Sequence, residues 1–233
     1  PVALALGLPA LFYVISTNVT INFVAHTMTT PLMNYVLIAL PAFLLSGRMM
    51  NTAGVTDRLF TFSQALVGRF KGGLAYANVV ASALFASMSG TAVGDAGGLG
   101  LVEMEMMDKA GYDKAFSAGV TACSSVLGPL IPPSVAMVVL GATAEINIGH
   151  LFMGGLIPGL LMMGALIVNL FLRGRFTEAG RTWPINKIPK EEFWPAILRG
   201  IPPLLVPAIV IGGISIGVVT PTEAAVLSII FSF

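Results

Sequence analysis

Long apolar stretches separated by short polar or charged ones dominate the hydrophobic pattern of this chain. Apolar runs of this kind predict helices that cross a membrane, because about 20 apolar residues span its hydrocarbon core. The predicted spans are residues 2–16, 32–50, 151–172 and 201–216. Within the second span, Pro41 predicts a kink. Between the first two, residues 16–30 are polar and almost uncharged, so we expect a loop or a short surface helix there.

Two other patterns predict helices of a different kind. Residues 56–70 combine apolar positions with the polar residues Arg58, Gln64 and Arg69, which predicts an amphipathic helix lying in the membrane interface, with Thr56 as its N-cap. Residues 220–223 read Thr-Pro-Thr-Glu, a capping box with proline at the first helical position. The box predicts the start of a final helix that the chain's end cuts short.

Residues 72–102 carry a single charge, Asp95, and are too long for one spanning helix. As one helix, these roughly 31 residues would measure about 46 Å, against a hydrocarbon core of about 30 Å. Glycines crowd the second half of the run. We therefore predict a re-entrant helical hairpin, with two arms of about 15 residues (about 22 Å each) that meet at residues 87–91.

A second interruption follows a charged segment at 103–114, which we expect to be a loop. Residues 115–127 predict a half-helix and residues 135–144 another. The linker 128–134 contains Gly128 and three prolines, so it cannot be regular helix. The chain is therefore expected to be an all-α integral membrane protein with a hairpin followed by a broken transmembrane helix.

Composition supports a membrane protein and excludes several other classes. The chain is 56% hydrophobic and 10% charged with a mean hydropathy of +0.90, whereas soluble domains carry about 25% charged residues. A net charge of +1 provides no basic surface for nucleic acid, and the single cysteine, Cys123, excludes a disulfide framework. Only two histidines are present, and no nucleophile–base set or phosphate loop is found, so we expect no enzyme. The chain opens on proline without a cleavable signal peptide, and both ends lie in apolar runs, so we expect a fragment.

Basic residues predict the orientation, because loops rich in Lys and Arg face the cytoplasm. If residues 72–102 return to the side they entered, every basic segment falls on one side. Those segments are Arg48 to Lys71, Lys109 with Lys114, and residues 173–190. A full crossing would split them, so the charge pattern favours a hairpin that enters from the cytoplasm.

Hydroxyls and backbone carbonyls at the two interruptions are the candidate ligands for a polar solute or ion. Ser87, Ser89 and Thr91 flank Gly90 at the hairpin tip. Small residues of this kind also serve plain helix packing. Thr121, Ser124, Ser125 and Ser134 lie in or beside the broken helix.

The linker prolines should free carbonyls that a hard cation such as Na⁺ satisfies, and the half-helix starting near Ser134 could face an anionic substrate. A simple proline kink is the alternative. Asp95 could be a cation ligand, a proton acceptor or a cap for the second arm.

Four stretches together resemble the large membrane subunit of TRAP (tripartite ATP-independent periplasmic) transporters, over roughly its first half. They are LPAFLLSGRMMNTAGVTDRL, SMSGTAVGDAGGLG, the segment from GYDKAFSAGV through GPLIPPSVAM to GGLIPGLL, and GVVTPTEAA. The resemblance implies a Na⁺-driven, elevator-type importer of organic acids such as C4-dicarboxylates or sialic acids, in the bacterial inner membrane. It also implies a small membrane subunit, separate or fused, and a periplasmic substrate-binding protein, with Na⁺ as coupling ion and no other cofactor.

The same resemblance implies a residue set and a division of the chain. The cation ligands would be Ser89, Thr91, Gly128, Ile131 and Pro133, with Ser87, Gly90, Asp95, Ser124, Ser125 and Ser134 supporting them or facing the substrate. Residues 1–71 would be scaffold helices with an interfacial arm, 72–144 the transport-domain hairpin and broken helix, 145–219 spanning helices with a cytoplasmic amphipathic arm, and 220–233 the start of a second inverted repeat. Proton coupling through Asp95 and a membrane scaffold without transport are the alternatives.

Overall fold

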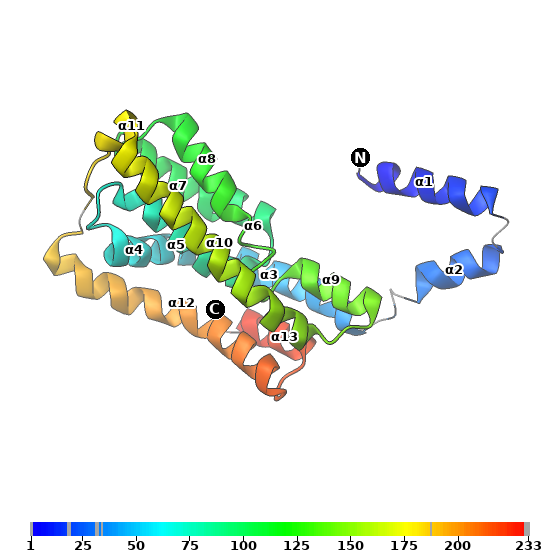
Figure 1. Cartoon of the computed structure of the whole chain (residues 1–233). Helices are drawn as coiled ribbons and strands as arrows, with labels where there is room; N and C mark the ends of the chain where they lie inside the picture. The colour runs from blue at the N-terminus through cyan, green and yellow to red at the C-terminus, as the bar shows by residue number, and fades with distance from the viewer. Residues whose placement is uncertain (1, 18–19, 31–32, 34, 187, 231–233) are drawn as a thin grey trace.

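The computed structural model describes the whole chain except residues 1, 18–19, 31–32, 34, 187 and 231–233, and no described residue lies in a strand (Figure 1). The helices are α1 (Val2–Ser16), α2 (Ile21–Thr29), η2 (Tyr35–Ile38), α3 (Ala39–Thr52), α4 (Val55–Val67), α5 (Gly73–Ser89), α6 (Ala92–Gly97), α7 (Leu99–Lys109), α8 (Lys114–Ser125), α9 (Val135–Ala144), α10 (Ile148–Phe176), α11 (Glu178–Arg181), α12 (Lys190–Ile216) and α13 (Pro221–Ile230). The all-helical prediction is confirmed.

The first helices differ in part from expectation. Helices α1 and α2 stand apart from the others in Figure 1, and α2 is the short helix foreseen between the first two spans. The span expected at 32–50 begins partly outside the described residues. Its described part is η2 followed by α3, which continues to Thr52. Pro41 lies in the first turn of α3 and makes no kink inside it, because a helix needs no backbone donor in its first turn.

Helix α4 begins one residue earlier than expected, and its cap is different. Gly54, with φ 72°, occupies the N-cap position, so the prediction that Thr56 caps this helix is wrong. Asp57 lies in the first turn, as expected from the positive end of the helix dipole. The helix packs against α5 and α12.

Helix α5 is the centre of the fold. Every residue from Gly73 to Ser89 except Leu84 is buried. Helices α3, α4, α7, α8 and α10 all pack against it, and the many alanines along it let these neighbours approach closely. An element buried on all sides is a rigid support for whatever chemistry stands at its end.

The break predicted at 87–91 is confirmed, since α5 ends at Ser89 and α6 starts at Ala92. The second arm is itself two helices, α6 and α7, divided at Gly98. The charged loop expected at 103–114 is wrong for most of its length. Helix α7 runs to Lys109 and packs against α5 and α8, which leaves only residues 110–113 as the connection.

The broken helix is confirmed as α8 and α9. Asp113 caps α8 by accepting from the Phe116 N–H at 2.9 Å, and Ser134 caps α9 by accepting from the Met137 N–H at 3.3 Å. The span expected from residue 151 begins earlier, because Asn147 caps α10 and the helix starts at Ile148.

Two long apolar helices follow. Within the described residues, Ile148–Phe176 and Glu191–Ile214 are the two helices long and apolar enough to cross a membrane. The region 173–190, expected to form the cytoplasmic amphipathic arm, supplies the end of α10, the short α11, a connection and the first residue of α12. Its role as an arm at the membrane surface stays a prediction. The final capping box is confirmed, with the Thr220 N–H donating to Glu223 Oε2 at 2.8 Å.

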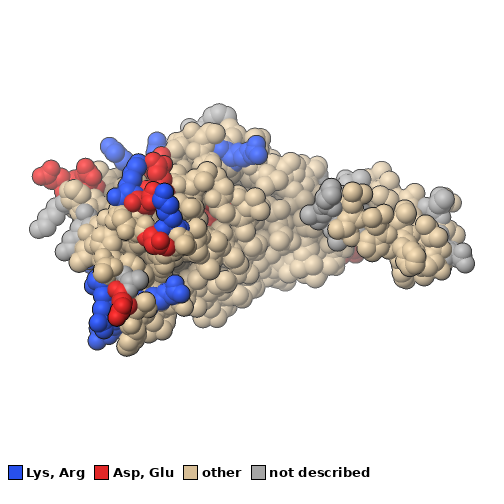
Figure 2. Space-filling view, turned by 90° about the horizontal axis from the view of Figure 1, so that it is seen from above, with Lys and Arg blue, Asp and Glu red and all other residues tan. Residues whose placement is uncertain are grey.

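Charged side chains gather over one end of the molecule in Figure 2, while most of the rest of that face is uncharged. This distribution fits the expectation that the basic segments share one side of a membrane. The membrane orientation itself and the division of the chain at 71, 144 and 219 stay predictions.

Candidate functional site

The hairpin tip is a three-residue turn between α5 and α6. Ser89 ends α5, Gly90 adopts φ 62°, and Thr91 is extended. The Thr91 hydroxyl accepts from the Gly94 N–H at 3.0 Å and so caps α6. The idea that Asp95 caps the second arm is therefore wrong, because Thr91 fills that role.

The linker between α8 and α9 lies directly against this tip, and the contact is made by backbone. The Val135 N–H donates to the Gly90 carbonyl at 3.1 Å. A Cβ atom on Gly90 would lie 2.6 Å from the Pro133 oxygen, and one on Gly128 would lie 2.7 Å from the Thr91 carbonyl carbon. Both distances are too short for any side chain. Glycine at these two positions is what allows the two interruptions to meet, and we call this region the tip–linker contact.

Some linker carbonyls already have partners. The Ser134 hydroxyl donates to the Pro129 carbonyl at 2.7 Å while it caps α9. The Gly90 carbonyl is used by Val135, and the Pro132–Pro133 peptide bond is cis. The expectation that the prolines leave unpaired carbonyls therefore does not hold for Pro129, because its carbonyl accepts a hydrogen bond from Ser134 within the linker.

The predicted cation ligands divide into two groups. Ser89, Thr91, Gly128 and Pro133 all lie at the tip–linker contact, with the Ser89 hydroxyl 3.4 Å from the Thr91 carbonyl. Ile131 lies in the same linker, where the linker residues were expected to bind mostly through their carbonyl oxygens, and its buried side chain packs against Gly159 of α10. The structure therefore places four of the five positions directly at the contact, and their role as ligands stays a prediction.

The predicted supporting residues divide similarly. Ser134 and Gly90 take part in the tip–linker contact. The Ser87 hydroxyl donates to the Leu84 carbonyl at 2.5 Å and that of Ser125 to the Ala122 carbonyl at 3.0 Å, so both are satisfied within their own helices. Of the remaining two, Asp95 is buried in α6, and Ser124 belongs to a second polar region.

That second region is a buried set of polar side chains between α5, α7 and α8, which we call the arm cluster. Its members are Asn78, Ser82, Glu103, Thr121 and Ser124, none more than 3% exposed. Asn78 Nδ2 donates to Thr121 Oγ1 at 2.7 Å, and the Ser124 hydroxyl donates to Asn78 Oδ1 at 2.8 Å. Ser82 Oγ lies 3.0 Å from Ser124 Oγ and 3.4 Å from Glu103 Oε1.

Reading the sequence missed Asn78, Ser82 and Glu103. The spacing carried a signal, because Asn78 and Ser82 are four residues apart and therefore share one face of an otherwise apolar helix. Thr121 and Ser124, three apart, do the same on α8. The prediction that Glu103 belongs to an exposed charged loop is wrong, because α7 turns this side chain into the interior.

Two carboxyl groups are buried in this part of the molecule, where α6 packs against α7. Asp95 of α6 and Glu103 of α7 are 1% and 0% exposed, and Ser82 Oγ lies 3.4 Å from Glu103 Oε1. Both Asp95 oxygens and Glu103 Oε2 have no hydrogen-bond partner among the described residues. Buried polar atoms without partners are rare, so this pair is a candidate for binding a proton or a cation.

A cavity of about 830 Å³ opens beside the hairpin tip. Ser89 and Thr91 line it from the tip, and Arg48 and Asn51 line it from α3. In the sequence, Arg48 counted only among the basic residues that predict the orientation. The structure places it at the same cavity as the candidate ion ligands.

A helix broken by prolines, set against a glycine turn in an all-helical chain with two long apolar helices, is the architecture of a membrane transporter subunit. The chain belongs to the family described as "Tripartite ATP-independent periplasmic transporter, DctM component", whose model matches residues 1–233. The resemblance seen in the sequence is thereby confirmed.

Named relatives agree with this family. The chain is 43% identical to the sialic acid TRAP transporter large permease protein SiaM of Vibrio cholerae, over all of this chain and 54% of that protein. It is 37% identical to the sialic acid TRAP transporter permease protein SiaT of Haemophilus influenzae (all of this chain, 37% of that protein). Identity is also 37% to the C4-dicarboxylate TRAP transporter large permease protein DctM of V. cholerae (all of this chain, 51% of that protein).

This chain spans about half the length of the large permease relatives that it matches. All three relatives are named as transporter permeases and not as enzymes, in agreement with the expectation that this family carries out no catalysis.

Proposed function

We propose that this chain is part of the large permease subunit of a Na⁺-coupled importer of small organic acids, of the C4-dicarboxylate or sialic-acid type. The observation that carries the proposal is the tip–linker contact. Two non-helical segments meet there, one following the buried helix α5 and one following α8, with hydroxyl and carbonyl oxygens at the junction. Hard cations prefer oxygen ligands of this kind.

The proposed coupling works through the contact itself. A Na⁺ ion bound by Ser89, Thr91 and linker carbonyls would attract both sides and favour the state in which they touch. Ion binding can shift a conformational equilibrium only by its preference for one state, and a site shared between two segments has such a preference. Helices α5 to α9 would then move together, as the elevator and re-entrant hairpin hypotheses require.

The cavity beside the tip is the proposed place for the solute. Its volume of about 830 Å³ is within the range of about 300–1,000 Å³ typical of small-molecule sites. The Arg48 guanidinium would pair with a substrate carboxylate, since arginine binds carboxylates through two parallel hydrogen bonds. An anion placed there would also reduce the repulsion between Arg48 and a Na⁺ ion at the tip.

The assembly is proposed from the family. A small membrane subunit and a periplasmic binding protein that delivers the acid would complete the transporter in the bacterial inner membrane. The family name, with its words tripartite and periplasmic, supports this part of the proposal.

The test is Na⁺-dependent uptake by the intact transporter in proteoliposomes. We expect Ser89→Ala combined with Thr91→Val to raise the Na⁺ concentration for half-maximal uptake at least about tenfold, because two ligands to a charged group are lost. Thr91→Ser, which keeps the hydroxyl, should leave it nearly unchanged. An unchanged Na⁺ dependence in the double variant would show that the ion binds elsewhere.

A second candidate function, proton coupling, is favoured by the carboxyl pair. If the Ser124 hydroxyl donates to Asn78, the Ser124 oxygen accepts from Ser82, and the Ser82 oxygen then faces Glu103 as an acceptor. A protonated Glu103 would complete this chain of hydrogen bonds. The same carboxyl group could release its proton toward Asp95.

Uptake driven by a pH gradient without a Na⁺ gradient tests proton coupling. If protons drive transport, Asp95→Asn and Glu103→Gln should abolish that uptake. Na⁺-driven uptake of wild-type size in both variants would rule this candidate out and leave the Na⁺ proposal standing.

A further inference from the structure

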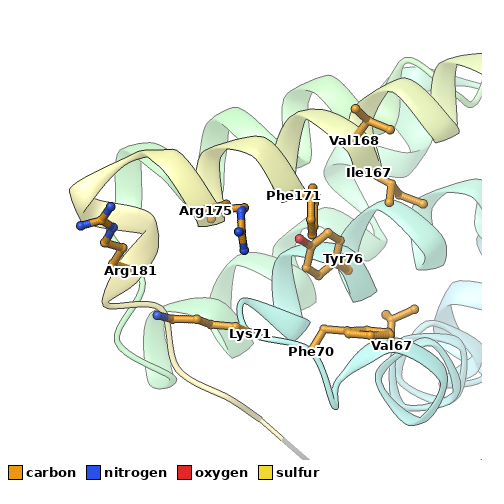
Figure 3. A pocket seen from close by; sticks show the side chains of 10 residues that line it. Val67, Phe70, Lys71, Tyr76, Ile167, Val168, Phe171, Arg175 and Arg181 are labelled. Carbon is orange, nitrogen blue, oxygen red and sulfur yellow. The ribbon is translucent and has the colours of Figure 1, made fainter.

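A second cavity, remote from the tip, lies between α5, α10 and the connection that joins α4 to α5 (Figure 3). Its volume is about 610 Å³. Its lining is mostly apolar, with three basic residues, and contains no acidic residue. A hollow with one apolar part and one cationic part fits a ligand that has the same two parts.

The apolar part follows one face of α10. Ile167, Val168 and Phe171 line the cavity, and their spacing places them on the same face of the helix. Val168 is 55% exposed and Phe171 57% exposed. Phe70 faces them from the other side and contacts the Tyr76 ring edge-on, with centroids 6.4 Å apart.

The cationic part lies at the end of the same face. Arg175 follows Phe171 by four residues and thus one helical turn. In Figure 3 its side chain extends from α10 toward the side where Lys71 lies, with Arg181 beyond them at the same end of the cavity. All three residues are exposed.

These basic groups lack compensating charges. Within the described part of the chain, none of the three forms an ion pair, and the ion pairs found are Lys109–Glu105 and Lys114–Asp108. Arg69 adds a further positive charge nearby, with its guanidinium 5.1 Å from the centre of the Phe70 ring. The excess of positive charge attracts an anion to this end of the cavity.

We propose that this cavity binds an anionic phospholipid, with its phosphate at Lys71, Arg175 and Arg181 and an acyl chain along the apolar face of α10. Helix α10 ends at Phe176, so the basic groups stand where a spanning helix leaves the hydrocarbon and the headgroups begin. Basic pockets between helices at this depth are suited to acidic headgroups. A protein helix filling the same space would have to bring a negative charge of its own to meet the three basic groups.

The experiment compares two double variants of the intact permease, purified in detergent. Lys71→Gln with Arg175→Gln removes two charges from the cavity. Arg58→Gln with Arg199→Gln removes two exposed charges that do not line it. Each protein is titrated with phosphatidylglycerol, with phosphatidylcholine and with inorganic phosphate, while thermal unfolding and bound lipid (by native mass spectrometry) are measured.

We expect phosphatidylglycerol to raise the unfolding temperature of the wild type and of the control variant by several degrees, and to bind as a discrete adduct. Phosphatidylcholine should do neither, and the cavity variant should lose most of the shift. Lys71→Arg with Arg175→Lys, which preserves both charges, should retain it. A full effect of inorganic phosphate alone would overturn the assignment of a lipid, as would equal lipid binding by cavity and control variants.

Site-specific cross-linking from position 171 in the assembled transporter tests whether a lipid or a neighbouring polypeptide occupies the cavity. Capture of lipid supports the proposal. Capture of a neighbouring transmembrane polypeptide in its place would overturn it.

Discussion

The tip–linker contact and the arm cluster both involve α5 and α8, yet they are built from different kinds of atoms. At the tip–linker contact, Gly90 lies against the main chain of Pro133 and Gly128 against the main chain of Thr91, with no side chain between them. In the arm cluster, Asn78, Ser82 and Ser124 join through side chains alone. Backbone atoms can be shared with an ion when a break exposes them, whereas paired side chains mainly fix how the helices pack. The tip–linker contact is therefore suited to bind and release a ligand, whereas the arm cluster is suited to hold the helices in a fixed arrangement.

The largest effect is expected where the backbone contact is closest. Gly128→Ala places a methyl group 2.7 Å from the Thr91 carbonyl carbon, so the linker and the tip must separate. We expect Na⁺-dependent uptake to be abolished and the protein destabilised by about 1–3 kcal/mol.

Gly119→Ala is the matched control, since Gly119 lies on the neighbouring helix with open space around it. Uptake and thermal unfolding of the two variants are measured side by side. If Gly128→Ala transports as well as Gly119→Ala, close backbone approach is not what makes the site.

The next largest effect is expected in the arm cluster, and it should change stability more than ion affinity. Asn78→Leu leaves Thr121 Oγ1 without its donor, while the Ser124 hydroxyl loses Asn78 and keeps Ser82 Oγ at 3.0 Å. Buried polar groups left unpaired cost about 1–3 kcal/mol each. Unfolding in detergent should show this loss, while the surviving protein should keep its half-saturating Na⁺ concentration.

Ser125→Ala provides the comparison for Asn78→Leu, because that hydroxyl bonds only to a carbonyl of its own helix. Equal stability of the two variants would mean that the arm cluster contributes little to packing.

A smaller effect is expected from the cap of α6. Thr91→Ala removes the acceptor for the Gly94 N–H and should destabilise the protein by about 1 kcal/mol. Thr143→Ala, on an exposed face of α9 where the hydroxyl bonds within its own helix, should cost less. Thermal unfolding measures both changes, and a larger loss for Thr143→Ala would contradict the capping role.

The smallest effect is expected at the surface. Glu105→Gln removes the ion pair with Lys109 at 2.7 Å, in which both side chains are 66% exposed. Solvent screens such pairs, so neither the unfolding temperature nor its dependence on salt should change measurably. A clear loss would indicate that this end of α7 is covered by another subunit in the assembly.

The sequence was sufficient for both interruptions and for the helices that flank them, although not for the extent of α7. Local signals were strong there, with glycines at the tip, prolines in the linker, and caps at Asp113, Ser134 and Thr220. The total length of the apolar run 72–102 also excluded a single spanning helix. These features depend on neighbouring residues and not on the tertiary fold.

The remaining features could not be predicted, because they depend on which face of each helix packs against a neighbouring helix. Glu103 lies among charged neighbours, and only the packing of α7 against α5 and α8 decides that this one carboxylate points inward. Thr91 and Asp95 were both able to cap α6, and the extended backbone at Thr91 decided between them. The ends of α10 and α12 were underestimated because charged residues continue a helix beyond the hydrocarbon without breaking it.

The hydrogen bond from Val135 to the Gly90 carbonyl has a consequence for how such a permease can diversify. Main-chain atoms are present whatever the side chains are, so the junction requires glycine at a few positions and leaves most neighbouring identities free. Relatives of this chain are named for sialic acid, for C4-dicarboxylates and for 2,3-diketo-L-gulonate. If the proposed ion site lies at this backbone junction, selection can change the solute by altering cavity side chains while the ion site is kept.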